Sequence, residues 1–309
     1  MGHEICEQEI TMAISDSQNY LHSKRLVNEL IAKSNITTSD LVLEIGPGKG
    51  IITEELVKCS KKVIAVELDR NLYLGLREKF SNTENLQLVN RDFLQTQLPA
   101  EEYKVFSNIP FNLTAEIIIK LLGASNPPND MFIIMQYEAA LKYSGEPYYA
   151  ESMRSLMYKP YFDIQMIHEF NPKDFYPIPN VSIVFVHFHK KEFSDITNAT
   201  AMDYWDFLSY IFSAQGKFFK EKTKKIFSYE QQKRLKKALE IGEEDHISTW
   251  TYPQWLGLFD CYNILVSKEK KLLVEGSYAN LSLQQSKLKK EHRDRNHGKG
   301  RNSKSHKKI

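Results

Sequence analysis

Residues 103–114, Tyr-Lys-Val-Phe-Ser-Asn-Ile-Pro-Phe-Asn-Leu-Thr, join a short apolar run to a helical pattern. The run predicts a strand, and Asn108, Ile109, Pro110 and Phe111 follow at its carboxyl end. The Asn108 side-chain oxygen and the Ile109 carbonyl can both accept hydrogen bonds from one NH2 group, while Pro110 removes a donor and fixes the turn. Phe111 offers a flat face to an unstacked base. These residues predict a site for a base amino group, although an Asn-Pro turn over a buried Phe would give the same short pattern.

The first 160 residues repeat this alternation of strand and helix. Four further apolar runs predict strands at residues 41–45, 63–66, 86–89 and 132–135. Helical patterns lie between them, and this alternation indicates a parallel sheet covered on both faces. Later, residues 164–170 and 182–189 are β-branched and aromatic, and they predict a hairpin pair at the sheet edge. The expected fold class is α/β, with a mostly parallel, Rossmann-like sheet of seven strands.

The pattern becomes helical after Glu192. Apolar residues recur at helical spacing in 204–211, 235–239 and 255–262, and Thr251 is the expected N-cap of the last of these helices. We predict a lead-in at 1–16, an α/β domain at 17–192, a smaller all-α domain at 193–276 and a basic tail at 277–309. The last 20 or so residues, rich in Lys, Arg, His, Gly and Ser, are expected to be disordered until bound.

Charge is distributed unevenly in a chain whose net charge is only +2. Residues 287–309 hold ten Lys and Arg against two acidic residues, and residues 217–237 hold nine against two. Two such clusters favour nucleic acid as a partner, although a single Lys-rich helix is more often a solvated face. The expected phosphate contacts in the second cluster are Lys217, Lys220, Lys222, Lys224, Lys225, Lys233 and Arg234.

Neither a membrane nor an oxidising compartment is indicated. No apolar run approaches the length of a bilayer-spanning helix, and the acidic N-terminus lacks a signal-peptide pattern. Cys6, Cys59 and Cys261 are scattered and form neither a disulfide framework nor a metal-ligand cluster. We therefore expect a cytoplasmic protein without a metal. A monomer is expected as well.

Four neighbouring strand ends carry groups suited to a nucleoside cofactor. The glycine loop at 46–50 leaves room for backbone amides to approach a ligand. Glu67 follows the second strand, where an acid binds a ribose diol, and Asp92 follows the third, where a carboxylate accepts from an adenine amino group. A dinucleotide-binding dehydrogenase would share Glu67 but would not need Asp92 or Asn108. The loop also lacks the Gly-Lys-Ser/Thr ending of a triphosphate site. Together these groups predict S-adenosylmethionine.

With these motifs the chain resembles the Erm-type rRNA adenine N6-methyltransferases and, more broadly, the KsgA-like rRNA adenine dimethyltransferases. The resemblance extends from residue 17 to about 265, and its segments are Ser17-Gln18-Asn19-Tyr20-Leu21, residues 44–50, Glu67-Leu68-Asp69, Asp92-Phe93 and residues 108–114. It implies a class I methyltransferase sheet with a helical C-terminal domain, S-adenosylmethionine as donor and a looped adenine of 23S rRNA as acceptor. In that family the consequence is resistance to macrolide, lincosamide and streptogramin B antibiotics.

The resemblance also implies roles by position. The expected cofactor-binding residues are Asn19, Leu21, Gly46, Glu67, Leu68, Asp92, Phe93 and Asn108. Gly46 would approach the methionine end, Glu67 the ribose, and Asp92 with Phe93 the adenine. Asn108 would link the cofactor to the target amine. Phe111 and Tyr20 would hold the base after it leaves its stack.

Phe111 departs from the family pattern, because Tyr is frequent at that place; a phenolic hydroxyl is therefore not required. The basic tail also goes beyond a compact family member. No catalytic histidine is expected, and His168, His187 and His189 lie in or beside strand patterns that indicate structural roles. Three alternatives remain open. They are a KsgA-like enzyme acting on small-subunit rRNA, a catalytically silent RNA-binding relative, and a DNA adenine methyltransferase.

Overall fold

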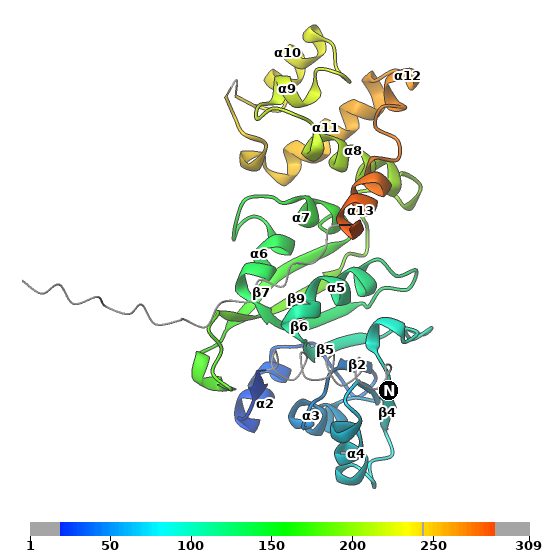
Figure 1. Ribbon diagram of the computed structural model, residues 1–309, viewed down its shortest axis with the longest axis vertical. Helices are drawn as coiled ribbons and strands as arrows, with labels where there is room; N and C mark the ends of the chain where they lie inside the picture. Colours follow the sequence, from blue (N-terminus) through cyan, green and yellow to red (C-terminus); the bar gives the residue numbers. More distant parts are fainter. Residues whose placement is uncertain (1–18, 243, 288–309) are drawn as a thin grey trace, which may run out of the picture.

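The computed structural model describes residues 19–242 and 244–287. It contains a sheet flanked by helices and a second group of helices at the end of the molecule farthest from α4 (Figure 1). The predicted lead-in at 1–16 and residues 288–309 of the predicted tail lie outside the described residues. Within the described part of the chain, no helix is both long enough and apolar enough to cross a bilayer.

Seven strands form the main sheet in the order β4-β3-β2-β5-β6-β9-β7. Their bounds are β2 Leu41–Ile45, β3 Lys62–Glu67, β4 Leu86–Asn90, β5 Lys104–Asn108, β6 Asp130–Gln136, β7 Phe162–Glu169 and β9 Ile183–Lys190. The strands from β4 to β6 are parallel, whereas β9 runs antiparallel to β6, and β7 runs antiparallel to β9. The prediction of a mostly parallel seven-stranded sheet is confirmed. The predicted hairpin pair is also present, but only β7 forms the edge because β9 lies between β6 and β7.

Helices cover both faces of this sheet. Their bounds are α2 Lys24–Ala32, α3 Ile51–Cys59, α4 Arg70–Lys79, α5 Thr114–Leu122, α6 Tyr137–Ser144 and α7 Met153–Tyr158. Successive residues of a strand point to opposite faces, so Val105 and Phe106 of β5 enter two different apolar clusters. α2 and α3 pack in the cluster of Phe106, and α5, α6 and α7 pack in that of Val105. The central strands are apolar without alternation because both of their faces are covered.

The C-terminal part is helical, as predicted. Its helices are α8 Ala201–Ser213, α9 Phe219–Thr223, α10 Tyr229–Ala238, α11 Tyr252–Leu265, α12 Lys268–Lys271 and α13 Ser277–Lys287. The Thr251 side chain accepts from the Gln254 amide, which confirms Thr251 as the N-cap of α11. Phe207 and Phe259 of these helices belong to the same apolar cluster as Val105. The helices and one face of the sheet therefore share a core. Short single-turn helices are η1 Phe93–Gln95, η2 Phe111–Leu113, η3 Pro172–Asp174, η4 Asn198–Thr200 and η5 Ile247–Thr249.

Helix α13 corrects the predicted boundary at residue 277, because residues 277–287 form a helix that packs on α8 and are not part of a tail. The buried Asp206 of α8 accepts the backbone N–H groups of Gly276 and Tyr278, both at 2.8 Å. The Trp205 and Tyr278 rings also meet edge to face, with centroids 5.0 Å apart. These contacts stabilise the start of α13 although its own sequence has little apolar periodicity. They join residues about 70 positions apart, so the local pattern did not reveal them.

Lys222 corrects a second prediction, because it is buried and does not present its charge to an RNA phosphate. Its Nζ donates to the carbonyls of Ile211, Phe212 and Ala214 at 3.1, 3.2 and 2.7 Å. Carbonyls at the end of a helix lack partners within that helix, so Lys222 of α9 satisfies the end of α8.

Lys222→Met keeps the apolar stem but removes the donor to these three carbonyls. We expect it to lower the free energy of unfolding by about 2–3 kcal/mol, measured by urea denaturation. Lys224→Met, at an exposed position of the same segment, should change it by no more than about 0.5 kcal/mol. Equal effects of the two substitutions would contradict the structural role.

A buried carboxyl lies in the middle of the sheet. Glu44 of β2 is 1% exposed, and its Oε2 accepts from the Thr53 hydroxyl at 2.7 Å. Burial raises the pKa of Glu44 to about 8, and the nearby Glu67 carboxylate adds to the shift. Because the pKa of an exposed Glu is 4.5, the folded protein binds more protons than the unfolded chain between about 4.5 and about 8. Stability attributable to Glu44 is therefore lost as the pH rises through this interval.

Glu44→Gln should remove this pH dependence. Between about pH 5 and about pH 8, the unaltered protein should lose stability relative to the variant as the pH rises. The loss should reach up to about 1.4 kcal/mol of unfolding free energy per pH unit. Urea denaturation at a series of pH values measures it. If the two stability curves run parallel, Glu44 is ionised in the folded protein and the prediction is wrong.

Candidate active site

β2 and β5 are neighbours that diverge toward their carboxyl ends. Their pairing covers Val42 with Lys104 and Leu43 with Val105. On the other side of each strand, by contrast, the pairing of β2 with β3 reaches Ile45 and that of β5 with β6 reaches Asn108. The helices that follow the two strands, α3 and α5, pack on opposite faces of the sheet. This is the topological switch point at which open α/β sheets bind ligands.

The buried Ser107 hydroxyl bridges the diverging strands. Its Oγ donates to the Ile45 carbonyl and accepts from the Ile45 N–H at 3.3 Å. These two bonds replace the strand pairing that β2 and β5 lack at this level. They also fix the separation of the residues that follow, Gly46 and Asn108. The sequence interpretation gave Ser107 no role, although a hydroxyl in a buried strand is an unusual residue that could have been noticed.

Two small hollows adjoin at Gly46. One, of about 50 Å³, is lined by Asn19, Tyr20, Leu21, Gly46, Pro47, Lys49, Ile51, Ile52, Asn108 and Ile109. The other, of about 40 Å³, is lined by Ile45, Gly46, Val66, Glu67, Leu68, Arg91, Asp92, Phe93, Leu94, Pro110, Leu113 and Ile117. The structure therefore places every predicted cofactor-binding residue on one of two adjoining hollows. We refer to the pair as the crevice.

Glu67 is 2% exposed and is held by two backbone amides. Its Oε2 accepts from the Gly48 N–H at 3.0 Å, and its Oε1 accepts from the Asp69 N–H at 2.9 Å. Burial raises the pKa of this carboxyl, while the two backbone hydrogen bonds favour the ionised form. Since a carboxylate has about four acceptor positions, it retains capacity for the two hydroxyls of a ribose.

Asp92 follows β4 and is the N-cap of the short helix η1. Its Oδ1 accepts from the Leu94 N–H at 2.8 Å, and its Oδ2 has only a long contact, 3.4 Å, with the Gln95 amide. Lys120 of α5 holds this turn, because its Nζ donates to the carbonyls of Phe93 and Leu94 at 2.7 and 2.9 Å. Lys120 is a residue that the sequence interpretation missed. Its position in an otherwise apolar helical stretch was the available signal.

The segment before α2 crosses over Asn108. β1 (Tyr20–Leu21) pairs with β8 (Phe175–Tyr176) in a separate two-stranded sheet, and the Asn19 amide donates to the Pro177 carbonyl at 2.6 Å. The Asn108 Nδ2 then donates to the Asn19 carbonyl at 2.8 Å. Because the amide nitrogen is occupied in this way, the Asn108 Oδ1 is the end that remains to accept a hydrogen bond. Within the described residues no donor to that oxygen is found.

The sequence predicted that backbone N–H groups of the glycine loop would be available to a ligand, but two of them are bonded within the protein. The Gly48 N–H bonds to Glu67, and the Gly50 N–H bonds to the Pro47 carbonyl at 2.9 Å. Gly48 has φ +58°, and a Cβ there would lie 2.7 Å from Cε1 of the Tyr20 ring. This glycine therefore makes room for Tyr20 and shapes the crevice wall. Burial, followed by the charges of Glu67 and Asp69, raises the pKa of the Tyr20 hydroxyl.

Among the residues predicted to bind the cofactor or the target base, Phe111 is the one that does not line the crevice. It lies in η2, is partly exposed, and packs against the apolar cluster that contains Phe106. Ile109 and Pro110 line the crevice on its two sides, one in each hollow.

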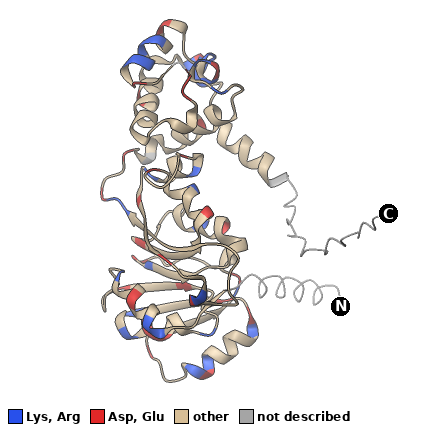
Figure 2. Cartoon of the chain, turned by 90° about the vertical axis from the view of Figure 1, so that its left-hand side faces the viewer, with Lys and Arg blue, Asp and Glu red and all other residues tan. Residues whose placement is uncertain are grey.

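The basic residues of the helical part lie away from the crevice, on α9 and α10 and the loops beside them. Apart from Lys222, the predicted phosphate contacts are all exposed, namely Lys217, Lys220, Lys224, Lys225, Lys233 and Arg234. Blue segments mark Lys and Arg in this part of the molecule in Figure 2. Lys224 and Lys225 also line a cavity of about 440 Å³ between α8, α9 and α13.

Comparison with solved structures shows the same fold. The crystal structure of the 23S rRNA methyltransferase ErmE superposes with a TM-score of 0.73 at 24% identity, and it covers 79% of this chain and 100% of ErmE. A dimethyladenosine transferase from Plasmodium falciparum gives 0.65 at 21% identity, with 79% and 97% covered. The expectation of a class I S-adenosylmethionine-dependent methyltransferase fold is confirmed.

Sequence comparison identifies relatives that are named as rRNA adenine N-6-methyltransferases. An rRNA adenine N-6-methyltransferase from Bacteroides fragilis is 30% identical over 78% of this chain and 90% of its own length. One from Bacillus anthracis is 28% identical over 82% of this chain and 88% of its own length. The family model described as ribosomal RNA adenine dimethylase matches residues 11–263. The chain therefore belongs to the ribosomal RNA adenine dimethylase family of methyltransferases.

Proposed function

We propose that this protein transfers methyl groups from S-adenosylmethionine to the N6 amino group of an adenine in 23S rRNA. The observation that carries the proposal is Asn108, which lines the crevice and whose amide nitrogen is bonded to the Asn19 carbonyl, so that its amide oxygen is left to accept a hydrogen bond. Relatives of this chain are named as rRNA adenine N-6-methyltransferases, and Asn-Ile-Pro-Phe favours the 23S branch over the KsgA-like branch. On this proposal methylation confers resistance to macrolide, lincosamide and streptogramin B antibiotics, and the enzyme acts as a cytoplasmic monomer.

The acceptors and apolar side chains that line the crevice match the groups of an adenosyl moiety. Glu67 would accept from the ribose hydroxyls, and Asp92 would accept from the adenine amino group beside Phe93. Leu68 would lie against the adenosyl group in the same hollow. Gly46 lies between the two hollows, so it would adjoin the methionine part, with Asn19 and Leu21 on the far side. When bound, the cofactor supplies an electrophilic methyl on a sulfonium.

The chain's own residues act on the target amine. The N6 nitrogen of adenine is a weak nucleophile because its lone pair is delocalised into the ring. The Asn108 Oδ1 and the Ile109 carbonyl would accept its two N–H groups and favour a tetrahedral nitrogen, whose lone pair then points at the methyl. Alignment of this kind can contribute several kcal/mol to the barrier. No general base is required before attack, since the methylated cation loses its proton readily.

RNA binding would involve the exposed basic residues of α9, α10 and the loops beside them, together with the basic residues of 287–309. Single-stranded or looped adenines are the RNA bases that a protein can unstack, so the acceptor is expected in a loop. Lys224 and Lys225 are the best placed of the basic residues, because they line a cavity large enough to admit a phosphate-ribose unit.

The test is a methyl-transfer assay on naked 23S and 16S rRNA with labelled S-adenosylmethionine, followed by primer extension. We expect one adenine of 23S rRNA to be modified and 16S rRNA to remain unmodified. Asn108→Ala should lower the rate by at least about 100-fold, while Asn129→Ala, a control at a half-buried asparagine outside the crevice, should leave it unchanged. Modification of 16S alone would replace the proposed target, and near-normal turnover of Asn108→Ala would refute its role.

The proposed stacking of the target base on Phe111 is tested by a substitution series. Phe111→Tyr and Phe111→Trp keep an aromatic face and should retain most activity. Phe111→Ala should lower kcat/KM by about 10- to 100-fold through lost stacking. Because Phe111 also packs on the core, Phe111→Leu is the matched control: it keeps apolar packing but lacks the ring. A Phe111→Leu enzyme as active as the Phe111→Tyr enzyme would show that stacking is not needed.

A further inference from the structure

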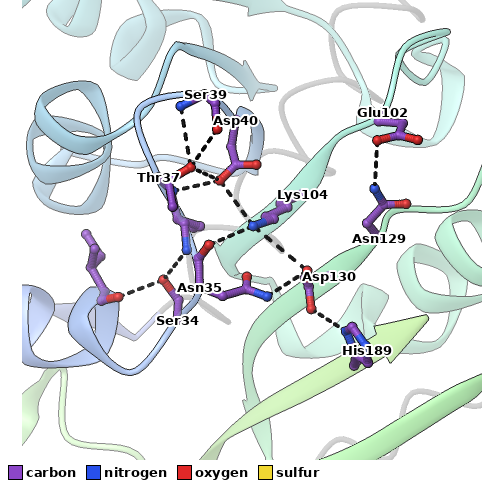
Figure 3. A network of polar contacts seen from close by, with 12 residues as sticks. Ser34, Asn35, Thr37, Ser39, Asp40, Glu102, Lys104, Asn129, Asp130 and His189 are labelled. Atoms are coloured by element: carbon purple, nitrogen blue, oxygen red, sulfur yellow. Dashed lines mark hydrogen bonds and ion pairs between the residues drawn. The ribbon is translucent and has the colours of Figure 1, made fainter. Parts of the chain in front are cut away.

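Three ligand-type side chains meet at the end of the sheet that lies opposite the crevice, where the parallel strands begin. They are Asp130, His187 and His189. Asp130 begins β6, and the two histidines lie near the end of the antiparallel β9. Figure 3 shows Asp130 and His189 side by side. His187 Nε2 and His189 Nδ1 both lie 2.8 Å from the same oxygen, Oδ1 of Asp130. The three ligand-type atoms are all within 4.8 Å of one another.

The strand register produces this convergence. Histidines two residues apart on one strand point to the same face, and Asp130 lies directly opposite His189 in the β6–β9 pairing. The His187 ring stacks on Phe132, with centroids 4.3 Å apart and planes 13° apart. This contact fixes the direction of the imidazole. Since Asp130 is 57 residues from His187 in the sequence, the cluster could not be recognised from local spacing.

Two residues outside this cluster orient the Asp130 carboxylate through its other oxygen. The Asn35 amide donates to Asp130 Oδ2 at 2.9 Å, and Lys104 Nζ lies 3.9 Å from the same oxygen. Lys104 is already paired with Asp40 at 3.1 Å and donates to the Asn35 carbonyl at 2.7 Å, as Figure 3 shows. With neutral imidazoles, the two carboxylates and one ammonium leave the group with one net negative charge. A dication is therefore not repelled.

We propose that Asp130, His187 and His189 bind a divalent transition-metal ion, for which Zn²⁺ is the best fit. Two imidazole nitrogens and one carboxylate oxygen suit Zn²⁺, whereas Mg²⁺ and Ca²⁺ prefer oxygen ligands alone. Each neutral imidazole would carry its single proton on the ring nitrogen that faces away from the ion, which leaves His187 Nε2 and His189 Nδ1 able to bind it. The ligand atoms would move apart by a few tenths of an ångström. The His189 side chain is 52% exposed, so water can reach the fourth position.

The ion would be structural. It would tie the start of β6 to the end of β9 and, through Asn35, to the loop after α2. The crevice lies at the other ends of the strands, so methyl transfer does not pass through this site. The proposal replaces the sequence expectation that the protein holds no metal, which rested on its scattered cysteines.

The experiment uses the full chain after treatment with a chelator and dialysis. We expect calorimetry to show one equivalent of Zn²⁺, Co²⁺ to give the visible absorption of a four-coordinate site, and Zn²⁺ to raise Tm. His189→Ala should abolish the bound equivalent and the rise in Tm. His22→Ala, also at an exposed histidine, should preserve both. The full chain also carries His292, His297 and His306, so a variant with all three replaced by alanine should still bind one equivalent.

Two further variants distinguish a metal site from a hydrogen-bond network. Asn35→Ala removes the donor to Oδ2 and should weaken Zn²⁺ binding by about 10- to 100-fold. Lys104→Met removes a positive charge near Oδ2 and should tighten Zn²⁺ binding, although in a plain network it would only remove an ion pair. The proposal is overturned if the chain binds no Zn²⁺, if His189→Ala binds it as well as the unaltered chain, or if replacing the three C-terminal histidines abolishes binding.

Discussion

The pair of hydrogen bonds between Ser107 and Ile45 is the constraint on which the crevice depends. Parallel strands that diverge leave backbone groups without partners, and such groups are costly when buried. The Ser107 hydroxyl satisfies the Ile45 N–H and carbonyl together. β2 and β5 can therefore separate just before Gly46 and Asn108, which opens a space there without breaking the sheet.

The residues around that space are stabilised by contacts made far from it in the sequence. Asn19 connects the N-terminal segment to Asn108 on one side and to Pro177 on the other. Lys120 holds the turn that carries Asp92. The Asn19 amide and the Lys120 ammonium both donate to backbone carbonyls. They therefore hold the ligand-binding acceptors in place and leave those acceptors available to the ligand. Glu44 and Glu67 are buried carboxyls close to the same place, which makes this part of the sheet sensitive to pH.

Much of the fold could be predicted because its signals are local. The central strands are buried on both faces and read as short apolar runs, and the residues at their carboxyl ends meet because parallel strands end at one edge. The residues that could not be predicted depend on tertiary contacts. In the sequence Lys222 cannot be told apart from the exposed lysines beside it, because the three carbonyls that its ammonium binds come from the end of α8. The start of α13 is stabilised by Asp206 of α8, a contact between residues far apart in the sequence. Asp130 meets the two histidines only because of the register in which β6 pairs with β9. The sequence shows an aromatic residue, Phe111, in the turn after β5. It does not show that this ring packs against the apolar core.

The central claim is that the diverging ends of β2 and β5 bring a sulfonium methyl and a target amine to one side chain, Asn108. A crystal structure of the protein with S-adenosylhomocysteine tests it most directly. The ribose hydroxyls should bond to Glu67, the adenine amino group should lie at Asp92, and the thioether sulfur should lie beside Gly46 and face Asn108. A ligand bound elsewhere, or bound here with its sulfur turned away from Asn108, would contradict the account.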